Sequence, residues 1–258
     1  MKRLLTAVAL IPIVTWVILW ADYWIFLAVL AAVALLCYYE YAGIAEGYGF
    51  GSLNMMGYGA GMLVLVWRGD AWPLMVVIAI IALAAAMRAD NLSKTLPRAA
   101  LLLMGVVYVF GCWKFALELR QSYSHHWLMY ALLLNWAGDS GAYYVGRAFG
   151  RHRMAPRVSP MKSWEGAIAS LVTSALVGGA YLFHFVPGTT IPAAIGLTIV
   201  ANAAGQLGDL AESAIKRGAS VKDSSAILPG HGGFLDRVDS TLFTLPVIYV
   251  WVKLAMSS

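Results

Sequence analysis

The chain has 258 residues, of which 61% are hydrophobic and 12% are charged, and its formal net charge is +5. Its mean hydropathy is +0.74, whereas a typical soluble domain carries about 25% charged residues. The composition excludes ordinary soluble enzymes, disordered proteins and nucleic-acid-binding modules. It predicts a polytopic membrane protein that partners a lipid bilayer and no nucleic acid.

Nine apolar runs predict about nine membrane spans, because a spanning helix needs about 20 apolar residues. The first run follows Met1-Lys2-Arg3 like a signal peptide, but no small-residue cleavage site follows it, so we expect a retained helix. We predict an all-α bundle in a single integral-membrane domain, 1–258, with N-terminal spans over about 1–120 and catalytic spans and loops over about 127–258. The runs are 4–20, 23–45, 53–67, 72–87, 99–117, 127–145, 166–186, 191–207 and 242–256.

Two Gly-x-x-x-Gly pairs, Gly43/Gly47 and Gly57/Gly61, accompany the second and third runs. Such pairs allow helices to approach closely. They also arise by chance among 25 glycines, so the signal is weak.

Lysine and arginine predict the orientation, because cytoplasmic loops of membrane proteins are enriched in both. With a cytoplasmic N-terminus and alternating spans, fourteen of these residues fall on the cytoplasmic side and three on the other, while Lys114 lies within a span. We therefore expect the long polar loops after the sixth and eighth runs to face the cytoplasm, together with the active site.

Ionisable residues are concentrated near the C-terminal end of the chain. A charge at mid-membrane costs about 2.5–3.5 kcal/mol even on the lenient insertion scale. An apolar protein therefore gathers ten ionisable groups within about thirty residues only where they pair or bind something. The ten are Asp209, Glu212, Lys216, Arg217, Lys222, Asp223, His231, Asp236, Arg237 and Asp239.

Spacing places several of these side chains on common helix faces. If the eighth helix continues past Leu207, positions i, i+3, i+4 and i+7 share one face; these are Asp209, Glu212, Ser213 and Lys216. Asp236 and Asp239 are again i and i+3 at the start of the ninth helix. Carboxylates from two helix ends can hold a hard divalent cation such as Mg²⁺, which commonly bridges substrate phosphates. Neighbouring lysines and arginines would balance phosphate charge.

Two further polar segments support an anion site. Leu228–Phe234 places three glycines around His231, and backbone amides in such a turn can approach an anion closely. No Walker A loop occurs in the chain. Asp139-Ser-Gly-Ala-Tyr ends the sixth run, and Ser163 with Gly166 predicts the start of the seventh helix, whose positive end suits Glu165.

At this point the sequence resembles a known family. Ser213-Ala-Ile-Lys-Arg, then Lys222-Asp223, then Leu228-Pro-Gly-His-Gly-Gly-Phe-Leu-Asp-Arg-Val-Asp239 is similar to the signature of phosphatidate cytidylyltransferases. The signature spans about 27 residues with many fixed positions, so a chance match is improbable. Asp139-Ser-Gly-Ala-Tyr and Ser159-Pro-Met-Lys-Ser-Trp-Glu-Gly166 also resemble family segments.

The resemblance implies that CTP and phosphatidate are the substrates, that Mg²⁺ (with room for a second cation) is the cofactor, and that CDP-diacylglycerol and pyrophosphate are the products. It also implies a homodimer and, with the compact chain, a bacterial inner membrane. The implied metal ligands are Asp209, Asp236 and Glu212. The implied catalytic and phosphate-contacting set is Asp209, Lys216, Arg217, Lys222, Asp223, His231, Asp236, Arg237 and Asp239. The implied substrate-binding set is Asp139, Arg157, Ser159, Lys162, Ser163, Glu165, Ser213, Gly232 and Gly233.

Simpler structural interpretations exist for several of these residues. The arginines of the 147–157 loop would also suit a topology-setting segment at the lipid headgroups. His231 would suit a hydrogen bond across its own turn, and Asp223 a solvated loop charge or a helix cap. Glu40, near the cytoplasmic end of the second run, would pair with a loop arginine or lie at the interface. Asp209 and Asp236 would serve as ion-pair partners of Arg217 and Arg237.

Two other functions compete with cytidylyl transfer. A transporter would place its carboxylates near mid-span and show paired repeats, but here the charges lie at predicted helix ends and no repeat is visible. A CTP-using lipid kinase would share both the nucleotide and the membrane, and its products would distinguish it. The Asp-Gly-x-x-Ala-Arg motif of the alcohol phosphotransferases that consume CDP-diacylglycerol is absent.

Overall fold

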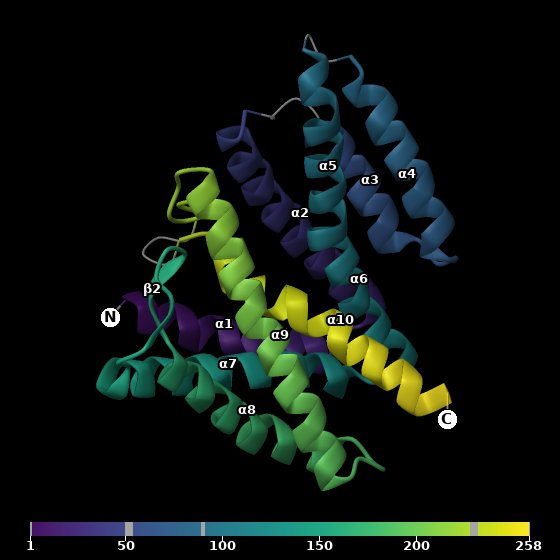
Figure 1. The fold of residues 1–258 in the computed structure, drawn as a ribbon. Coiled ribbons are helices and arrows are strands. Elements are labelled where there is room, and N and C mark those ends of the chain that lie inside the picture. The colour runs from purple at the N-terminus through teal and green to yellow at the C-terminus, as the bar shows by residue number, and fades with distance from the viewer. Residues whose placement is uncertain (1, 50–53, 89–90, 228–231, 258) are drawn as a thin grey trace. The chain divides into compact units, whose positions relative to one another are not determined.

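The computed structural model describes residues 2–49, 54–88, 91–227 and 232–257, and these ranges are predominantly helical (Figure 1). Each of the nine predicted apolar runs coincides with a helical segment of the described chain, which confirms an all-α protein. The elements are α1 (Lys2–Leu19), α2 (Tyr23–Gly47), α3 (Asn54–Val66), α4 (Ala71–Ala86), η2 (Leu92–Lys94), α5 (Thr95–Gly105), η3 (Val106–Gly111), α6 (Cys112–Glu118), η4 (Leu119–Tyr123), α7 (His125–Phe149), β1 (Arg153–Ala155), β2 (Ser159–Ser163), α8 (Trp164–Phe185), α9 (Ile191–Gly218) and α10 (Leu235–Ser257).

Five helical segments are long and apolar enough to cross a membrane. They cover Tyr23–Gly47, Leu92–Tyr123, Trp164–Phe185, Ile191–Gly218 and Leu235–Ala255. Shorter apolar helices cover Leu10–Leu19, Met55–Val66 and Ala71–Ala86. The protein is therefore a polytopic membrane protein, and the number of nine spans stays a prediction.

The chain forms two compact units, each assembled from separate stretches of sequence. Unit 1 comprises Met1–Asp22, Phe115–Ala214 and Val238–Ser258; unit 2 comprises Tyr23–Lys114 and Ile215–Arg237. The polar segment Ile215–Arg237 thus groups with the N-terminal helices. Each unit is described separately below.

Unit 2 packs α2, α3, α4 and α5 with the π-helical turn η3. Two glycines of α3 permit the close approach. A Cβ at Gly57 would lie 1.5 Å from the Tyr38 hydroxyl, and one at Gly61 would lie 2.0 Å from the Phe110 ring. The Gly57/Gly61 pair therefore has the packing role that its spacing suggested. Gly43 has open space at its Cβ position.

Gly61→Ala should destabilise the protein by about 1–3 kcal/mol, because the added methyl group must displace the buried Phe110 ring. Gly59 lies on the same helix with nothing within 4 Å of its Cβ position. Gly59→Ala is thus a matched control, expected to be neutral or stabilising by up to about 1 kcal/mol. Thermal unfolding in detergent micelles measures both changes, and equal shifts would contradict the packing role of Gly61.

Unit 1 is built around α7 and α8, which lie side by side, with α1 also packed on α7 (Figure 1). Their interface is polar for a membrane protein. The Ser174 hydroxyl donates to the Leu134 carbonyl at 2.6 Å, and the Thr173 hydroxyl bonds to the Ala137 carbonyl at 3.1 Å. A Cβ at Gly141 would lie 2.3 Å from the Thr173 hydroxyl. Small residues and internally satisfied hydroxyls let these helices approach closely.

A short antiparallel hairpin joins α7 to α8, and the sequence analysis did not anticipate it. Strand β1 pairs with β2 in a register that sets Arg153 opposite Ser163 and Ala155 opposite Ser159. The Val158 amide closes the turn on the Ala155 carbonyl at 3.1 Å. The polar loop after the sixth run is therefore an ordered ribbon, which fixes the position of residues on β2.

Candidate active site

A polar cavity of about 740 Å³ lies within unit 1, in the size range of small-molecule sites. It is formed by α7, the hairpin, α8, α9 and the first part of α10. Its charged and amide-bearing lining residues are Asn135, Asp139, Arg147, Arg153, Lys162, Asn202, Gln206 and Asp209. A cavity with charges of both signs is unusual in a chain this apolar, and it is where the sequence-predicted residues Asp139, Lys162 and Asp209 converge.

One wall of this cavity is a hydrogen-bonded ladder of neutral polar side chains. The Asn202 amide donates to Ser174 at 2.8 Å and to Ser170 at 3.0 Å. Gln206 donates to the Asn202 carbonyl oxygen at 2.7 Å. Gly138 makes room for the ladder, because a Cβ there would lie 2.6 Å from the Asn202 amide nitrogen. The sequence analysis missed these residues, since isolated Asn, Ser and Gln side chains in apolar runs match no motif.

Four carboxylates are gathered near the same cavity. Asp239, on α10, lies within electrostatic range of Asp139 on α7 and of Asp209 and Glu212 on α9. Glu212 is 1% exposed and Asp239 is 7% exposed. Helix α9 continues to Gly218, as the predicted face required, and α10 begins at Leu235, so that Asp236 and Asp239 lie in its first turns as the spacing predicted. Carboxyl groups this close together disfavour one another's ionised forms, and a positive partner favours them.

Lys162 supplies one such positive charge. Its ammonium lies 2.6 Å from a carboxylate oxygen of Asp209, and Ser213 donates to the other oxygen at 3.4 Å. Lys162 reaches Asp209 because strand β2 carries it to α9. Both side chains stay partly exposed, at 26% and 33%, so the pair is accessible to solutes. The simpler structural interpretation paired Asp209 with Arg217, whereas the ion pair in the structure is with this lysine.

Two predicted substrate-binding residues have structural partners at the hairpin base. Ser163 caps α8, since its hydroxyl accepts a hydrogen bond from the Gly166 amide at 3.2 Å. Glu165, in the first turn of α8, accepts the His152 amide at 3.2 Å and contacts its ring Nδ1 at 2.6 Å. The predicted helix start is confirmed. Ser163 thus holds the start of α8, and Glu165 holds the residue before the hairpin.

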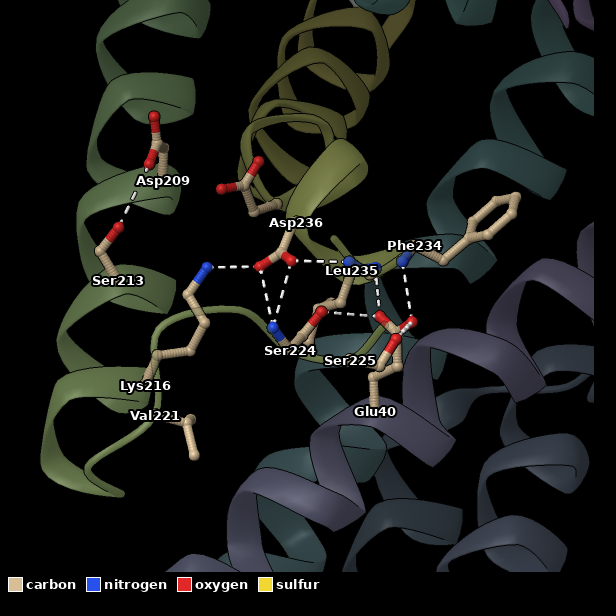
Figure 2. Close-up of polar contacts among 12 residues, drawn as sticks. Glu40, Asp209, Ser213, Lys216, Val221, Ser224, Ser225, Phe234, Leu235 and Asp236 are labelled. Atoms are coloured by element: carbon tan, nitrogen blue, oxygen red, sulfur yellow. Dashed lines mark hydrogen bonds and ion pairs between the residues drawn. The ribbon is translucent and has the colours of Figure 1, made fainter. Parts of the chain in front are cut away.

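In unit 2, Asp236 and Lys216 form a buried ion pair (Figure 2). Each side chain is 9% exposed. The Asp236 carboxylate also accepts backbone amides, from Ser224 at 3.1 Å and from Gly233 at 2.8 Å. The simpler structural interpretation paired Asp236 with Arg237, but its ion-pair partner is Lys216, and Arg237 is exposed. Asp236 therefore joins the end of α9, the following loop and the start of α10.

Glu40, on α2, contacts the same loop (Figure 2). It is 1% exposed and accepts four hydrogen bonds: from the hydroxyls of Ser224 (2.9 Å) and Ser225 (2.6 Å) and from the amides of Phe234 (2.8 Å) and Leu235 (2.6 Å). In the described chain its partners are serine hydroxyls and backbone amides in place of the expected loop arginine, and the interfacial position stays a prediction. A lone carboxylate inside an apolar run was the sequence signal for this site.

The described part of the glycine turn serves the same two carboxylates. Gly232 has φ +76°, and a Cβ there would lie 2.7 Å from Asp236. A Cβ at Gly233 would lie 1.9 Å from the Ser224 hydroxyl and 2.5 Å from Glu40. The expected anion contacts of this turn are therefore met, at Gly233, Phe234 and Leu235, by side chains of the protein itself. His231 lies outside the described residues.

The remaining predicted residues are exposed or partly exposed. The Arg217 guanidinium donates to the Val221 carbonyl at 3.0 Å, which closes the turn after α9. Arg157, Lys222, Asp223 and Arg237 are exposed, and Ser159 is half-buried. In the described chain, Arg157 and Ser159 lie outside the cavity lining of unit 1. Their positions leave them available to a solute.

The donor set suits a hard divalent cation, because carboxylate oxygens are the ligands that Mg²⁺ prefers. The carboxyl groups of Asp139, Asp209 and Glu212 all lie within electrostatic range of Asp239, and a cation would favour their ionised forms. Within the described residues, however, no three His, Cys, Asp or Glu side chains are placed to share one ion. Side-chain rotation, foremost of Asp209 away from Lys162, would have to accompany metal binding.

Fold and site together define a helical membrane protein with a charged, solvent-accessible cavity and a polar segment held by carboxylates. The chain belongs to the cytidylyltransferase family, whose model matches residues 1–255. It is 43% identical over 152 residues to a phosphatidate cytidylyltransferase of Staphylococcus aureus (strain COL), covering 59% of this chain and 58% of that one.

Two other relatives have the same name. The chain is 50% identical over 124 residues to that of Haemophilus influenzae, covering 46% of this chain and 43% of the relative. It is 39% identical over 155 residues to that of Bacillus subtilis (strain 168), covering 58% and 57%. The chain thus spans somewhat more than half the length of the Staphylococcus and Bacillus relatives that it matches.

Proposed function

We propose that the protein transfers CMP from CTP to phosphatidate, giving CDP-diacylglycerol and pyrophosphate, in phospholipid biosynthesis. The observation that carries the proposal is the polar cavity of unit 1, with Lys162 and four carboxylates, in a membrane chain of the cytidylyltransferase family. The names of the relatives supply the substrates.

The chemistry requires little proton transfer by the protein. Phosphatidate is a phosphate monoester whose second pKa is near 6, so its oxygen is a nucleophile at neutral pH without a general base. That oxygen attacks the α-phosphorus of CTP, the bond from the α-phosphorus to the bridging oxygen breaks, and pyrophosphate leaves with the electron pair. Catalysis then consists of holding two anions together and neutralising the charge that develops on the leaving group.

The basic side chains are assigned to the phosphates, and the acidic side chains to the metal ion. Lys216, Arg217, Lys222 and Arg237 contact phosphates, and Arg157, Ser159 and Lys162 hold the lipid phosphate or the nucleotide. Mg²⁺ bound by Asp209, Asp236 and Glu212, with support from Asp139 and Asp239, would supply positive charge to the CTP phosphates. Asp236 can take this part only when it releases some of the donors that it accepts in the structure.

The proposal extends to the setting of the protein. A cytoplasmic N-terminus in a bacterial inner membrane agrees with the lysine and arginine bias and places the site where CTP is available. A homodimer and a second cation complete the proposal.

Transfer of label tests this function. Purified protein in detergent micelles is given phosphatidate, Mg²⁺ and CTP labelled at either the α- or the γ-phosphate. We expect α-label to enter the lipid, pyrophosphate to be released, and EDTA to stop the reaction. Entry of γ-label alone would indicate a lipid kinase. Transfer of neither label by folded protein would favour a transporter.

A further inference from the structure

We propose that Glu40 is a positioning residue for Asp236 and Lys216. Its carboxylate, carried by α2, binds two serine hydroxyls of the segment after α9 and two backbone amides where α10 begins, and so holds these parts of the chain together. The inference concerns the loop itself and stands on contacts within unit 2 (Figure 2). Its effect on turnover rests on the proposed function.

The hydrogen bonds of Glu40 match what an ionised carboxylate can accept. Such a group has about four lone-pair sites and no donor. Here Oε1 accepts from the Ser225 hydroxyl and the Phe234 amide, and Oε2 accepts from the Ser224 hydroxyl and the Leu235 amide. The distances of 2.6–2.9 Å are those of charge-assisted bonds. Because all four partners are donors, a carboxylate fits this position better than an amide, whose NH2 group cannot accept a hydrogen bond.

Glu40 also occupies the positive end of a helix. Leu235 is the first residue of α10, and the first amides of a helix have no partner inside it. A negative group there is stabilised by those amides and by the helix dipole. Glu40 caps α10 from 195 residues away in the sequence. Because the carboxylate fills this place, the amides of Phe234 and Leu235 are engaged with Glu40 rather than with a substrate phosphate.

Ser224 connects Glu40 to the ion pair. Its hydroxyl donates to Glu40 at 2.9 Å, and its amide donates to Asp236 at 3.1 Å. One residue is therefore held by two carboxylates that come from α2 and α10. Loss of either carboxylate releases Ser224, so the position of Asp236 depends on Glu40 through a chain of two hydrogen bonds.

The same arrangement leaves no room for a side chain at position 233, which is a glycine. Its Cβ position lies 1.9 Å from the Ser224 hydroxyl and 2.5 Å from a Glu40 oxygen, so any side chain at 233 would displace the contact. The glycine is thus explained by the close approach of Glu40 and Ser224 to the backbone. No nucleotide contact is needed to account for it.

Hydrogen exchange without substrate tests the proposal. In Glu40→Gln, the NH2 group of the glutamine side chain would face hydrogen-bond donors and could not accept from them. The backbone amides of Phe234 and Leu235 should therefore exchange their hydrogens at least about tenfold faster. Exchange in the apolar part of α2, Phe26–Tyr38, should not change. Glu46→Gln, an exposed glutamate on the same helix, is the matched control and should change neither region.

Three results would overturn the proposal. Unchanged exchange at Phe234 and Leu235 in Glu40→Gln would remove the anchor. Faster exchange spread equally along α2 would make Glu40 a general packing residue. Equal effects of Glu46→Gln would remove the specificity. If Glu40→Gln cannot be purified, Ser225→Ala and Glu40→Asp replace it; both should raise exchange at Phe234 and Leu235 by smaller factors, and no change in either would overturn the anchor.

Kinetics separate positioning from stability. At a temperature where both proteins are folded, Glu40→Gln should lower kcat/KM for CTP at least about tenfold, and Glu40→Asp should restore part of the loss because the charge returns. A normal kcat/KM alongside faster exchange would overturn the link from loop to turnover. If wild-type protein transfers no label while the exchange results hold, the proposed function fails and the anchor remains.

Discussion

Asp209→Asn should lower the rate of cytidylyl transfer at least about 100-fold while the protein still inserts, purifies and unfolds near its normal temperature. Loss of one preorganised electrostatic group typically costs this much in turnover. The stability effect should be small, because the Asp209–Lys162 pair is partly exposed and such pairs contribute about 1 kcal/mol or less. The measurement is initial rate with α-labelled CTP, beside thermal unfolding of the same preparation.

A metal readout makes the test independent of turnover. With Asp209 neutral, calorimetric titration of Mg²⁺ should show at least about tenfold weaker binding, since a ligand charge has been removed. Asp70→Asn is the matched control: Asp70 caps α4 through the Trp72 amide at 3.0 Å, and Asn caps a helix about as well as Asp. Normal transfer in Asp209→Asn would remove Asp209 from the site.

The helices could be predicted from the sequence because the apolar runs are long and the bilayer sets their length. Boundaries were predicted less well where polar residues continue a helix. The apolar run 242–256 alone would start the ninth helix too late, whereas the spacing of Asp236 and Asp239 predicted an earlier start. Helix α10 does begin at Leu235, whose amide donates to Glu40. No periodicity in apolar residues can reveal a cap donated by another helix.

The hairpin was missed for a different reason. Its strands are three and five residues long and are joined through Pro156, so they give no alternating pattern above chance. Pairing, rather than propensity, makes them strands. The consequence for the site is direct, because the hairpin brings Lys162 to Asp209.

The sequence predicted which residues form the candidate site, but not which of them pair with one another. Charge concentration and the family signature identified Asp209, Lys216 and Asp236. Neither could show that Lys162 pairs with Asp209, or that Lys216 pairs with Asp236. Glu40 lies 184 residues from Ser224 in the chain, so its hydrogen bonds follow from the tertiary structure alone.

Asp236→Asn should destabilise the protein by about 3–5 kcal/mol and abolish transfer, because it leaves the buried Lys216 ammonium without the charge of Asp236. Adding Lys216→Met keeps most of the side-chain volume and removes that ammonium. The double variant should therefore recover most of the lost stability. Denaturant unfolding of wild type, both single variants and the double variant gives the coupling energy as a double-mutant cycle.

Transfer rate and stability should respond differently to this pair of changes. If Asp236 and Lys216 act on the metal and the CTP phosphates, the stable double variant still loses at least about 100-fold in rate, because the reacting charges have lost both partners. If the pair serves only to hold the loop, the rate should return with the stability, and Asp236 would leave the metal site. The Asp236 carboxylate already accepts hydrogen bonds from Lys216 and from two backbone amides. To bind a metal ion it would have to give up one of these donors. The double variant has no carboxylate at this position and therefore cannot bind the ion.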